Sequence, residues 1–330
     1  MSTTSERRGP SRREFVAFGL GAFAVVALPL VERRRGRVVR RTMPVMGTIA
    51  TFAVVHRDER QAHAAIDAAM DELRRVERTM TRFTTTSDIG LANSGAARGP
   101  VVVGSETALV VNEALRWADA TDGAYDPAIG GAIMLWDVNH RHEPPPAERV
   151  ARMAGRALHR AIEVDTHRGV PVLLYRDGDA QLDLGAIAKG YGVDRAVVAL
   201  RERGVGSAIV EAGGDLYALG TAPGGDPWRV GIQDPNDDRA LIATVDVADA
   251  AVATSGTYRQ FFRYRGRRYH HLLDPVTGAP RETVVRSLTI QADSCMHADV
   301  AATALYGMPA DRAARVLTRC VPGGSVVRSA

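Results

Sequence analysis

The hydrophobic positions of the chain follow a helical period in some segments and a strand period in others. Between residues 61 and 80, apolar side chains recur every three or four positions with arginine and glutamate between them, which predicts an amphipathic helix. A second helix is predicted from Ser105, a favourable capping residue, through Trp117. Three more helices are predicted over residues 188–203, 298–306 and 309–318.

Short apolar runs bounded by glycine, proline and polar turns predict the strands. Residues 261–264 and 268–273 flank an Arg-Gly-Arg turn and predict a hairpin. Gly213 and Gly214, before an acid, indicate close backbone approach, either to a ligand or in a tight hairpin. Helices and hairpins are segregated rather than alternating, so we predict an α+β fold with antiparallel sheets and flanking helices. The other predicted strands cover residues 46–52, 181–184, 207–211, 228–233, 241–247, 251–253 and 284–292.

Composition places few limits on the folded body. With 330 residues and 45% hydrophobic content, the chain can bury a substantial core, as one large domain or as two closely associated subdomains. The net charge of +4 owes much to arginines before residue 42. We therefore expect no basic surface interleaved with aromatic residues in the body, and no nucleic-acid partner.

Residues 1–31 predict a targeting segment rather than part of the fold. Ser-Arg-Arg-Glu-Phe at residues 11–15 directly precedes an apolar run, which is the arrangement of a twin-arginine export signal. The run is short for a membrane-spanning helix, which needs about 20 apolar residues. We expect a periplasmic protein, or one held at the outer face of the cell membrane if residues 15–31 are kept as an anchor. A basic linker is predicted over residues 32–42, the functional domain over 43–320 and a tail over 321–330.

Two sets of residues suggest chemistry that we do not expect here. Cys295 and Cys320 are the only cysteines; they could form one disulfide after export, but we expect two free thiols, and their spacing matches no metal motif. His140, His142 and Glu143 lie beside three prolines, where we expect solvated side chains rather than a metal site.

The strongest candidate for a functional site is the stretch from Gln181 to Arg195. It contains Lys189, the only lysine of the chain, and a compact ammonium suits a single phosphate oxygen better than a planar guanidinium does. Gly185 separates a predicted strand from a helix that starts at Ala188, and a helix N-terminus directs backbone N–H groups toward an anion. The stretch therefore predicts phosphate binding, although Lys189 could also be an ordinary surface lysine.

Two further pairs of residues could carry chemistry. Asp299 and Thr303 are four residues apart, so their oxygen atoms leave the predicted helix on one face. This pair could hold Mg²⁺, which prefers oxygen ligands, or it could be a helix cap and a hydroxyl bonded back to a carbonyl. His270 and His271 are adjacent on a predicted strand and face opposite sides. At most one of them can therefore serve a given site as a general base.

Seven short motifs occur in a fixed order along the chain. They are Met-Gly-Thr at 46, Gly-Ala-Tyr-Asp-Pro at 123, Asp-Leu-Gly-Ala-Ile-Ala-Lys-Gly-Tyr at 183, Gly-Gly-Asp-Leu at 213, Thr-Ser-Gly-Thr-Tyr at 254, His-Leu-Leu-Asp-Pro-x-Thr-Gly at 271 and Ala-Asp-x-x-x-Thr-Ala at 298. Over residues 43–308 the conjunction resembles the ApbE-type FAD:protein FMN transferases. The resemblance implies an ApbE-like fold and a Mg²⁺-dependent enzyme that cleaves FAD, moves FMN onto a threonine or serine hydroxyl of an acceptor protein, and releases AMP.

By matching position, the resemblance also implies roles for individual residues. Asp299 and Thr303 would bind Mg²⁺ through their side chains and Ala186 through its carbonyl, with Lys189 beside the diphosphate and His271 as the base toward the acceptor hydroxyl. Phe83 stands where tyrosine is frequent in the family, so a hydroxyl contact is lost there while ring stacking remains. Eight residues would hold FAD: Met46, Phe83, Ala124, Tyr125, Asp126, Asp183, Lys189 and Leu272.

The implied partner is a membrane respiratory flavoprotein with a short target similar to Ser/Thr-Gly-Ala-Thr/Ser. Two other interpretations stay open. Some members of the family hydrolyse FAD to FMN and AMP, with water in place of the acceptor hydroxyl, and the sequence offers little to separate this activity from transfer. An exported FAD carrier would do no chemistry, but the metal-side residues and His271 argue against it.

Overall fold

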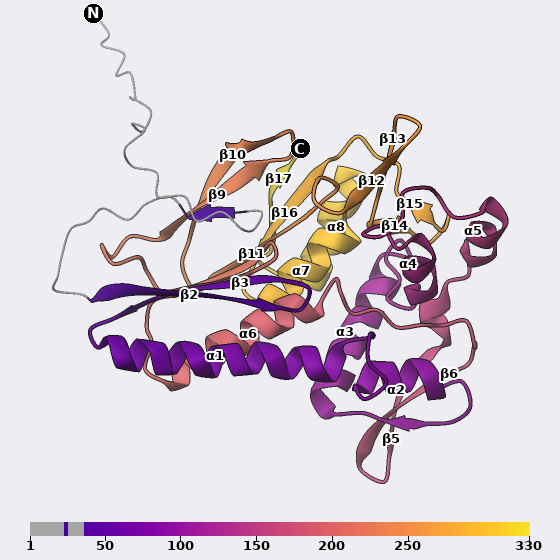
Figure 1. The fold of residues 1–330 in the computed structure, drawn as a ribbon, viewed down its shortest axis with the longest axis horizontal. Coiled ribbons are helices and arrows are strands. Elements are labelled where there is room, and N and C mark those ends of the chain that lie inside the picture. The colour runs from indigo at the N-terminus through magenta and orange to yellow at the C-terminus, as the bar shows by residue number, and fades with distance from the viewer. Residues whose placement is uncertain (1–22, 26–35) are drawn as a thin grey trace, which may run out of the picture.

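The computed structural model describes residues 23–25 and 36–330 of the chain. Its largest sheet is antiparallel and has seven strands in the order β17-β16-β11-β8-β7-β3-β2 (Figure 1). Strands from the beginning and the end of the described chain therefore lie in one sheet. The strands are β2 (Arg37–Val45), β3 (Thr48–His56), β7 (Ala208–Ala212), β8 (Asp215–Leu219), β11 (Ala250–Gly256), β16 (Ser287–Ala292) and β17 (Ser325–Ser329).

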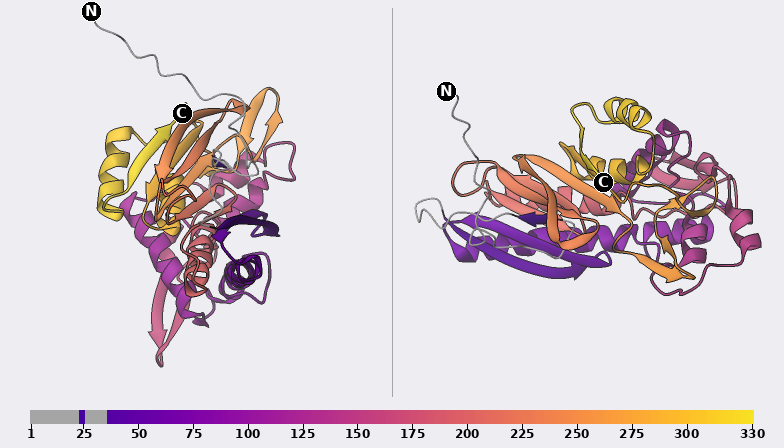
Figure 2. Two further views of the ribbon diagram at one scale, coloured as in Figure 1. Left: turned by 90° about the vertical axis from the view of Figure 1, so that its left-hand side faces the viewer. Right: turned by 90° about the horizontal axis from the view of Figure 1, so that it is seen from above.

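Three helices cover one face of this sheet (Figures 1 and 2). They are α1 (Glu59–Met80), α6 (Ala188–Glu202) and α7 (Cys295–Ala304), with α6 packed between the other two. The apolar positions of α1 share one face, where Ile66 and Leu73 are fully buried. Asp58 caps α1 by accepting hydrogen bonds from the backbone N–H groups of Arg60 and Gln61. The long helix predicted from residue 61 onward is thus confirmed.

A small sheet of three strands covers the opposite face. Its order is β1-β9-β10, with β1 (Phe23–Val25), β9 (Trp228–Asp234) and β10 (Asp237–Val247). Phe23 is buried there in one apolar cluster with Trp228 and Ile232 of β9 and with Leu216 and Val252 of the large sheet. Three residues of the predicted targeting segment therefore pair with β9, and the rest of that segment, including the Arg-Arg pair, lies outside the described residues. No helix in the described part of the chain is long and apolar enough to cross a membrane.

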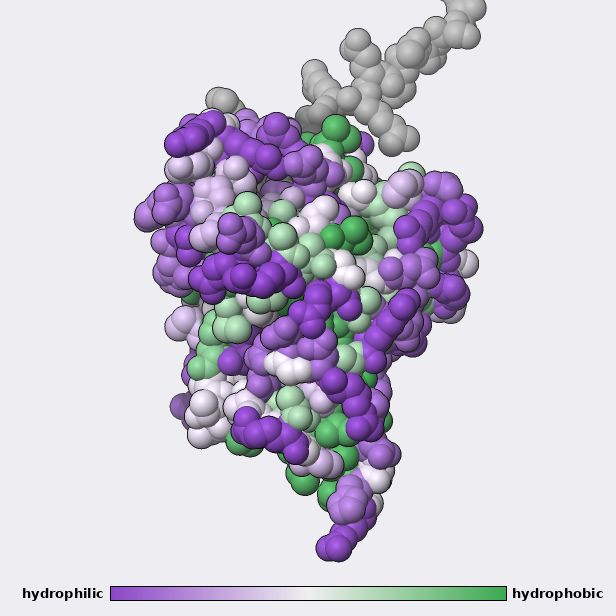
Figure 3. Space-filling view, turned by 90° about the vertical axis from the view of Figure 1, so that its right-hand side faces the viewer, coloured by the Kyte–Doolittle hydropathy of each residue, from purple (hydrophilic) through white to green (hydrophobic). Residues whose placement is uncertain are grey.

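A second group of elements adjoins the large sheet, on the right-hand side of Figure 1. Trp117 and Leu173 of this group belong to the same apolar core as Ile66 of α1, so the two parts are closely associated. The β5–β6 hairpin projects from the body and has a hydrophilic tip (Figure 3). The elements are α2 (Asp88–Gly95), β4 (Val101–Val102), α3 (Ser105–Ala120), α4 (Gly130–Trp136), α5 (Ala147–Met153), the 3-10 helix η1 (Leu158–Ala161), β5 (Ile162–His167), β6 (Val170–Tyr175), β12 (Phe261–Tyr264), β13 (Arg267–His270), β14 (Leu273–Asp274), β15 (Ala279–Pro280) and α8 (Ala310–Cys320).

Several segments differ from the sequence predictions, and three of them bear on the domain bounds and the site. Residues 37–42, expected in a linker, form the first part of β2 because β3 supplies an antiparallel partner, and β17 lies within the predicted tail because it pairs with β16. The strand predicted over 181–184 is not regular. Its first residue makes a single bridge to Ile129, and the N–H of Leu182 donates to Oδ1 of Asn93 instead of to a neighbouring strand.

Candidate functional site

The N-termini of α6 and α7 meet at the candidate site. A Cβ on Gly190 would lie 2.3 Å from the carbonyl oxygen of Cys295, so only glycine lets the two backbones come this close. Asp194, one turn further along α6, accepts hydrogen bonds from the N–H groups of Cys295 at 2.8 Å and Met296 at 2.9 Å. The sequence Lys-Gly-Tyr-Gly-Val-Asp therefore fixes how α6 and α7 cross.

Lys189 lies at this crossing among several oxygen atoms. Its Nζ is 3.0 Å from Oδ2 of Asp215 and 3.3 and 3.2 Å from Oδ1 and Oδ2 of Asp299. It also donates to the carbonyl oxygen of Gly185 at 3.0 Å. Both aspartate side chains are only 4% exposed. Lys189 is therefore part of a buried ion cluster and not an ordinary surface lysine.

The charges of this cluster do not balance. Burial lowers the pKa of Lys189, but the charges of Asp215 and Asp299 outweigh burial and raise that pKa above its ordinary value. Burial, together with the charge of Asp299, raises the pKa of Asp215 well above its ordinary value. One ammonium thus faces two buried carboxylates, and uncompensated buried charge is costly. Either a proton on Asp215, whose pKa is raised, or a further cation would offset it.

Asp215 is a site residue that the sequence analysis missed. It begins β8, directly after Gly213 (φ 60°) and Gly214 (φ 101°). Ala212 and Asp215 pair across these two residues, so the glycines make a tight hairpin, and a Cβ on Gly213 would lie 2.7 Å from Oγ1 of Thr48 in β3. The signal that could have identified Asp215 is a carboxylate in an otherwise apolar strand, which needs a cationic partner.

The three residues predicted to bind Mg²⁺ supply oxygen donors near the crossing. Asp299 lies in the second turn of α7, whose N-cap is Ser294, so it is not the capping residue that the sequence allowed. Oγ1 of Thr303 bonds to Oγ of Ser255 at 2.8 Å. Among the described residues, the carbonyl of Ala186 accepts no backbone hydrogen bond. The N–H of Gly190, four residues further on, donates instead to Oδ2 of Asp299 at 3.1 Å.

These donors fit a hard divalent cation. No group of three or more His, Cys, Asp or Glu side chains that could hold a metal occurs in residues 23–25 and 36–330. A cation at Asp299 would therefore be held by one carboxylate together with hydroxyl and carbonyl oxygens, and Mg²⁺ commonly binds through one or two carboxylates plus oxygens of a phosphate substrate.

Tyr125 and Asp183, both predicted to hold FAD, lie close to the ion cluster. The hydroxyl of Tyr125 is buried and has no partner within the described part of the chain. Burial, and then the charges of Asp299 and Asp183, raise the pKa of Tyr125 well above its ordinary value. Asp183 accepts a hydrogen bond from the N–H of Gly185 at 2.8 Å and pairs with Arg82. A buried hydroxyl without a partner is unfavourable, so Tyr125 is ready to donate to a bound ligand.

Phe83, Met46 and Leu272, also predicted to hold FAD, lie in different surroundings. Phe83 is 80% exposed, so its ring is accessible to a planar ligand. The Arg82 guanidinium lies 4.3 Å from the ring centroid. Met46 occupies the β2–β3 turn with φ 52°, and its N–H donates to Oε1 of Glu77 at 2.7 Å. Leu272 is buried.

Ala124 and Asp126 belong to the turn that follows α3. Asp126 is 3% exposed, and its Oδ2 is 3.1 Å from both the backbone N and the ring Nδ1 of His159. The carbonyl of Ala124 accepts from the Arg281 guanidinium, which also donates to the carbonyl of Tyr306 at 2.5 Å. Arg281 and His159 were missed because their partners are distant along the chain. Together they fix the shape of this turn.

His270 and His271 face different surroundings, but only His270 lies on a strand, because β13 ends there. His270 is buried, with its ring edge-on to Tyr306 at a centroid distance of 6.4 Å. Nδ1 of His271 lies 3.4 Å from the carbonyl oxygen of Gln260. Burial, with smaller effects from the charges of His270 and Lys189, lowers the pKa of His271 to about 4. His271 is therefore a neutral imidazole at pH 7 in the neighbourhood of Lys189.

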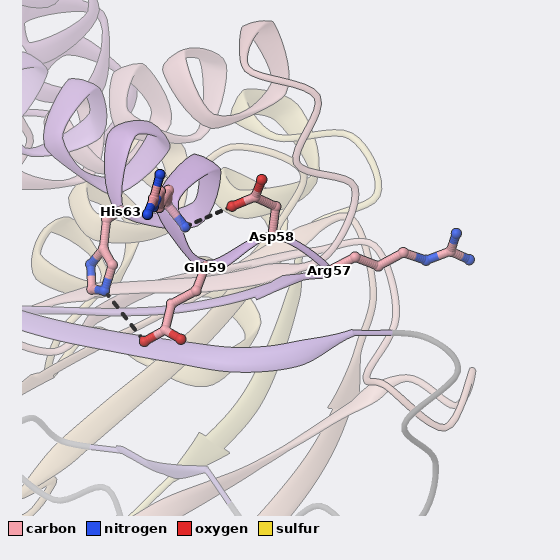
Figure 4. A pocket seen from close by; sticks show the side chains of 5 residues that line it. Arg57, Asp58, Glu59 and His63 are labelled. Atoms are coloured by element: carbon pink, nitrogen blue, oxygen red, sulfur yellow. Dashed lines mark hydrogen bonds and ion pairs between the residues drawn. The ribbon is translucent and has the colours of Figure 1, made fainter.

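Other candidate features lie elsewhere. His140 pairs with Asp137 at 2.7 Å in an exposed segment, and Cys295 and Cys320 are both buried and unpaired. A shallow hollow of about 740 Å³ lies at the start of α1 (Figure 4), where Glu59 and His63 pair at 3.8 Å and Asp58 is occupied as the helix cap. Its lining consists of four charged residues and a histidine, and we assign it no function. The lining residues are Arg57, Asp58, Glu59, Arg60 and His63.

The fold and the site place this chain in the class of α+β proteins with a buried cluster of one lysine and two aspartates where the N-termini of two helices meet. Comparison with known proteins makes this specific. The chain belongs to the ApbE family, whose family model matches residues 46–324.

Named relatives and solved structures agree with this assignment. The chain is 34% identical over 306 residues to the FAD:protein FMN transferase of Treponema pallidum, covering 88% of this chain and 84% of that one. It is 34% identical over 280 residues to the enzyme of the same name from Vibrio cholerae, covering 82% and 81%. The ApbE protein of Thermotoga maritima superposes with a TM-score of 0.78 at 28% identity, covering 89% of this chain and 97% of that one. The flavin transferase ApbE of Vibrio cholerae superposes with a TM-score of 0.75 at 30% identity, covering 88% and 92%. The predicted α+β, ApbE-like fold is therefore confirmed.

Proposed function

We propose that this protein is a Mg²⁺-dependent FAD:protein FMN transferase. The observation that carries the proposal is the buried cluster in which Lys189 faces two carboxylates. Such a cluster suits phosphoryl transfer, which depends on positioning and on neutralising phosphate charge more than on covalent chemistry by the protein. The names of the relatives support the same activity.

Different residues of this chain bind the metal and the phosphate groups. Asp299, Thr303 and the carbonyl of Ala186 would hold Mg²⁺, which when bound neutralises charge on the diphosphate of FAD. Lys189 donates to a phosphate oxygen, and the free hydroxyl of Tyr125 supplies a further donor. These groups fix the phosphorus atom of the FMN half for in-line attack.

His271 accepts the proton of the acceptor hydroxyl. The hydroxyl oxygen of a threonine or serine forms a bond to the FMN phosphorus, the bond from that phosphorus to the bridging oxygen breaks, and AMP leaves with that oxygen. A neutral imidazole, with its pKa lowered to about 4, is in the right form to take this proton at pH 7. In the absence of an acceptor, water in the same position would give FMN and AMP.

The test is to incubate the purified protein with FAD and Mg²⁺, with and without a peptide that contains Ser-Gly-Ala-Thr. We expect AMP to be released in step with a gain of one FMN mass on the peptide. FMN and AMP without peptide labelling would instead indicate a hydrolase. Unchanged FAD would indicate a carrier and contradict the proposal.

We further propose export by the twin-arginine route, with an acceptor protein in the respiratory membrane. The support is the Arg-Arg motif before the apolar run. Replacing Arg12 and Arg13 by lysine should retain the protein inside the cell, as fractionation would show. Unchanged export of this variant would contradict the proposed route.

A further inference from the structure

The β12–β13 hairpin carries a dense set of basic and aromatic residues. Residues 261–270 contain four arginines, four phenylalanine or tyrosine rings and no acidic side chain. The expectation that the folded body lacks a basic surface interleaved with aromatic residues is therefore wrong, because antiparallel pairing gathers these side chains on one small element.

One face of the hairpin is anchored in the protein. Tyr269 lies between two other rings, with its centroid 5.1 Å from Phe262 and 5.7 Å from Trp136 of α4, both stacked. On this side Arg267 forms an ion pair with Glu282. Stacked aromatic residues hold a hairpin firmly, so the opposite face is presented in a defined orientation.

The other face holds two arginines directly opposite each other. Arg263 pairs with Arg268 across the strands, and their guanidinium carbons lie 5.8 and 4.3 Å from the ring centroid of Phe261. Burial, and then the charges of Arg263 and Arg286, lower the pKa of Arg268, so both of the other guanidinium groups act on Arg268. Like charges in directly opposed positions destabilise a hairpin.

No acidic residue in the described part of the chain pairs with these three arginines. By contrast, Arg229 pairs with Asp246. The cluster of Arg263, Arg268 and Arg286 therefore tolerates repulsion that an external anion would relieve. Guanidinium groups bind carboxylates through paired hydrogen bonds.

We propose that the Arg263–Arg268–Arg286 cluster docks an acidic segment of the acceptor protein. The inference rests on the proposed function. His271 directly follows β13 in the chain, so the cluster lies only a few residues from the group that receives the acceptor proton. A nucleic acid is disfavoured because such binding commonly uses about six to ten phosphate contacts, and a membrane surface is disfavoured because the cluster is small and adjoins the reaction site.

The test compares two labelled peptides that share the Ser-Gly-Ala-Thr target, one flanked by four glutamates and one by four glutamines. Binding is measured by fluorescence anisotropy at low salt without FAD, so failure of FMN transfer leaves this test intact. We expect the glutamate peptide to bind about tenfold more tightly, an effect that two or three exposed ion pairs supply together. The preference should disappear at high salt.

Arg263→Glu is the informative variant because it creates an attractive pair with Arg268 across the strands. It should unfold at the same or a higher temperature than the unaltered protein and yet lose the preference for the glutamate peptide. Arg57→Glu, at the start of α1 and far from the hairpin along the long axis (Figure 1), makes the same charge change and should keep the preference.

Equal binding of both peptides would overturn the proposal. So would a preference that survives in Arg263→Glu or disappears equally in Arg57→Glu. Anionic phospholipid vesicles or duplex DNA that bind through Arg263 when the glutamate peptide does not would assign the surface to a membrane or to nucleic acid instead.

Discussion

At the level of single residues, the candidate site is built on one ammonium held between two buried carboxylates. Lys189 could be singled out from the sequence because it is the only lysine, and Asp299 and Thr303 because of their helical spacing. Asp215 could not, because its partners come from α6 and α7, and only the folded chain brings β8 next to them. Arg281 could not be identified from the sequence for the same reason, since its partners are backbone carbonyls of remote turns.

Removing the Lys189 ammonium should leave the repulsion between the Asp215 and Asp299 carboxylates uncompensated. Lys189→Met should lower the free energy of unfolding in metal-free buffer by about 3 kcal/mol or more, as expected for a buried charge that loses its partner. Lys189→Met with Asp215→Asn should recover much of this loss, because one negative charge is then gone. Urea denaturation measures both. Simple additivity of the two substitutions would show that the charges do not interact.

The lowered pKa of His271 predicts the acid limit of activity. An imidazole with a pKa of about 4 stays neutral above that pH and loses its ability to accept a proton only as the pH falls through 4. The value of kcat/KM should therefore hold through pH 5–6 and fall near pH 4. The His271→Asn variant should have a lower kcat/KM, and this value should not fall further near pH 4. An acid limb near 6.5, the ordinary histidine value, would contradict the assignment.

At the scale of elements, periodicity was a reliable guide where an element is long or local. The amphipathic pattern predicted α1, and the Arg-Gly-Arg turn predicted the β12–β13 hairpin. The strand predicted over residues 181–184 failed because alternation says nothing about a partner, and loop and side-chain acceptors take up its backbone groups. The crossing of α6 and α7 was not predictable either, because it depends on backbone contact at Gly190.

Adding a side chain at Gly190 should push α6 and α7 apart. Gly190→Ala places a Cβ 2.3 Å from the Cys295 carbonyl oxygen, so we expect a loss of about 1–3 kcal/mol in the free energy of unfolding and weaker binding of Mg²⁺. Gly206→Ala is the control, since nothing lies within 4 Å of a Cβ there. Thermal unfolding with and without Mg²⁺ would show both effects. Equal behaviour of the two variants would mean that α7 moves freely.

At the scale of the whole molecule, a single apolar core joins the seven-stranded sheet to the second group of elements. Segregated helices and hairpins were enough to predict the α+β class. The sequence did not show that Phe23 of the targeting segment would be buried against β9, because an apolar run suits a leader and a strand equally well.

Removal of residues 1–35 should expose one edge of β9. Residues 23–25 pair with residues 230–232, so amide hydrogen exchange there should quicken by about tenfold, which corresponds to roughly one net hydrogen bond. Exchange in β7 should not change. Unaltered exchange in β9 would show that β1 contributes nothing to the stability of the body.

The most direct test of the central claim is the Mg²⁺ dependence of AMP release from FAD by the unaltered protein and by Asp299→Asn. We predict a rate that saturates with Mg²⁺ for the unaltered protein and no detectable release for the variant, although its circular dichroism spectrum stays the same. Normal AMP release by Asp299→Asn at the same controlled Mg²⁺ concentrations would contradict the claim that α7 holds the cation.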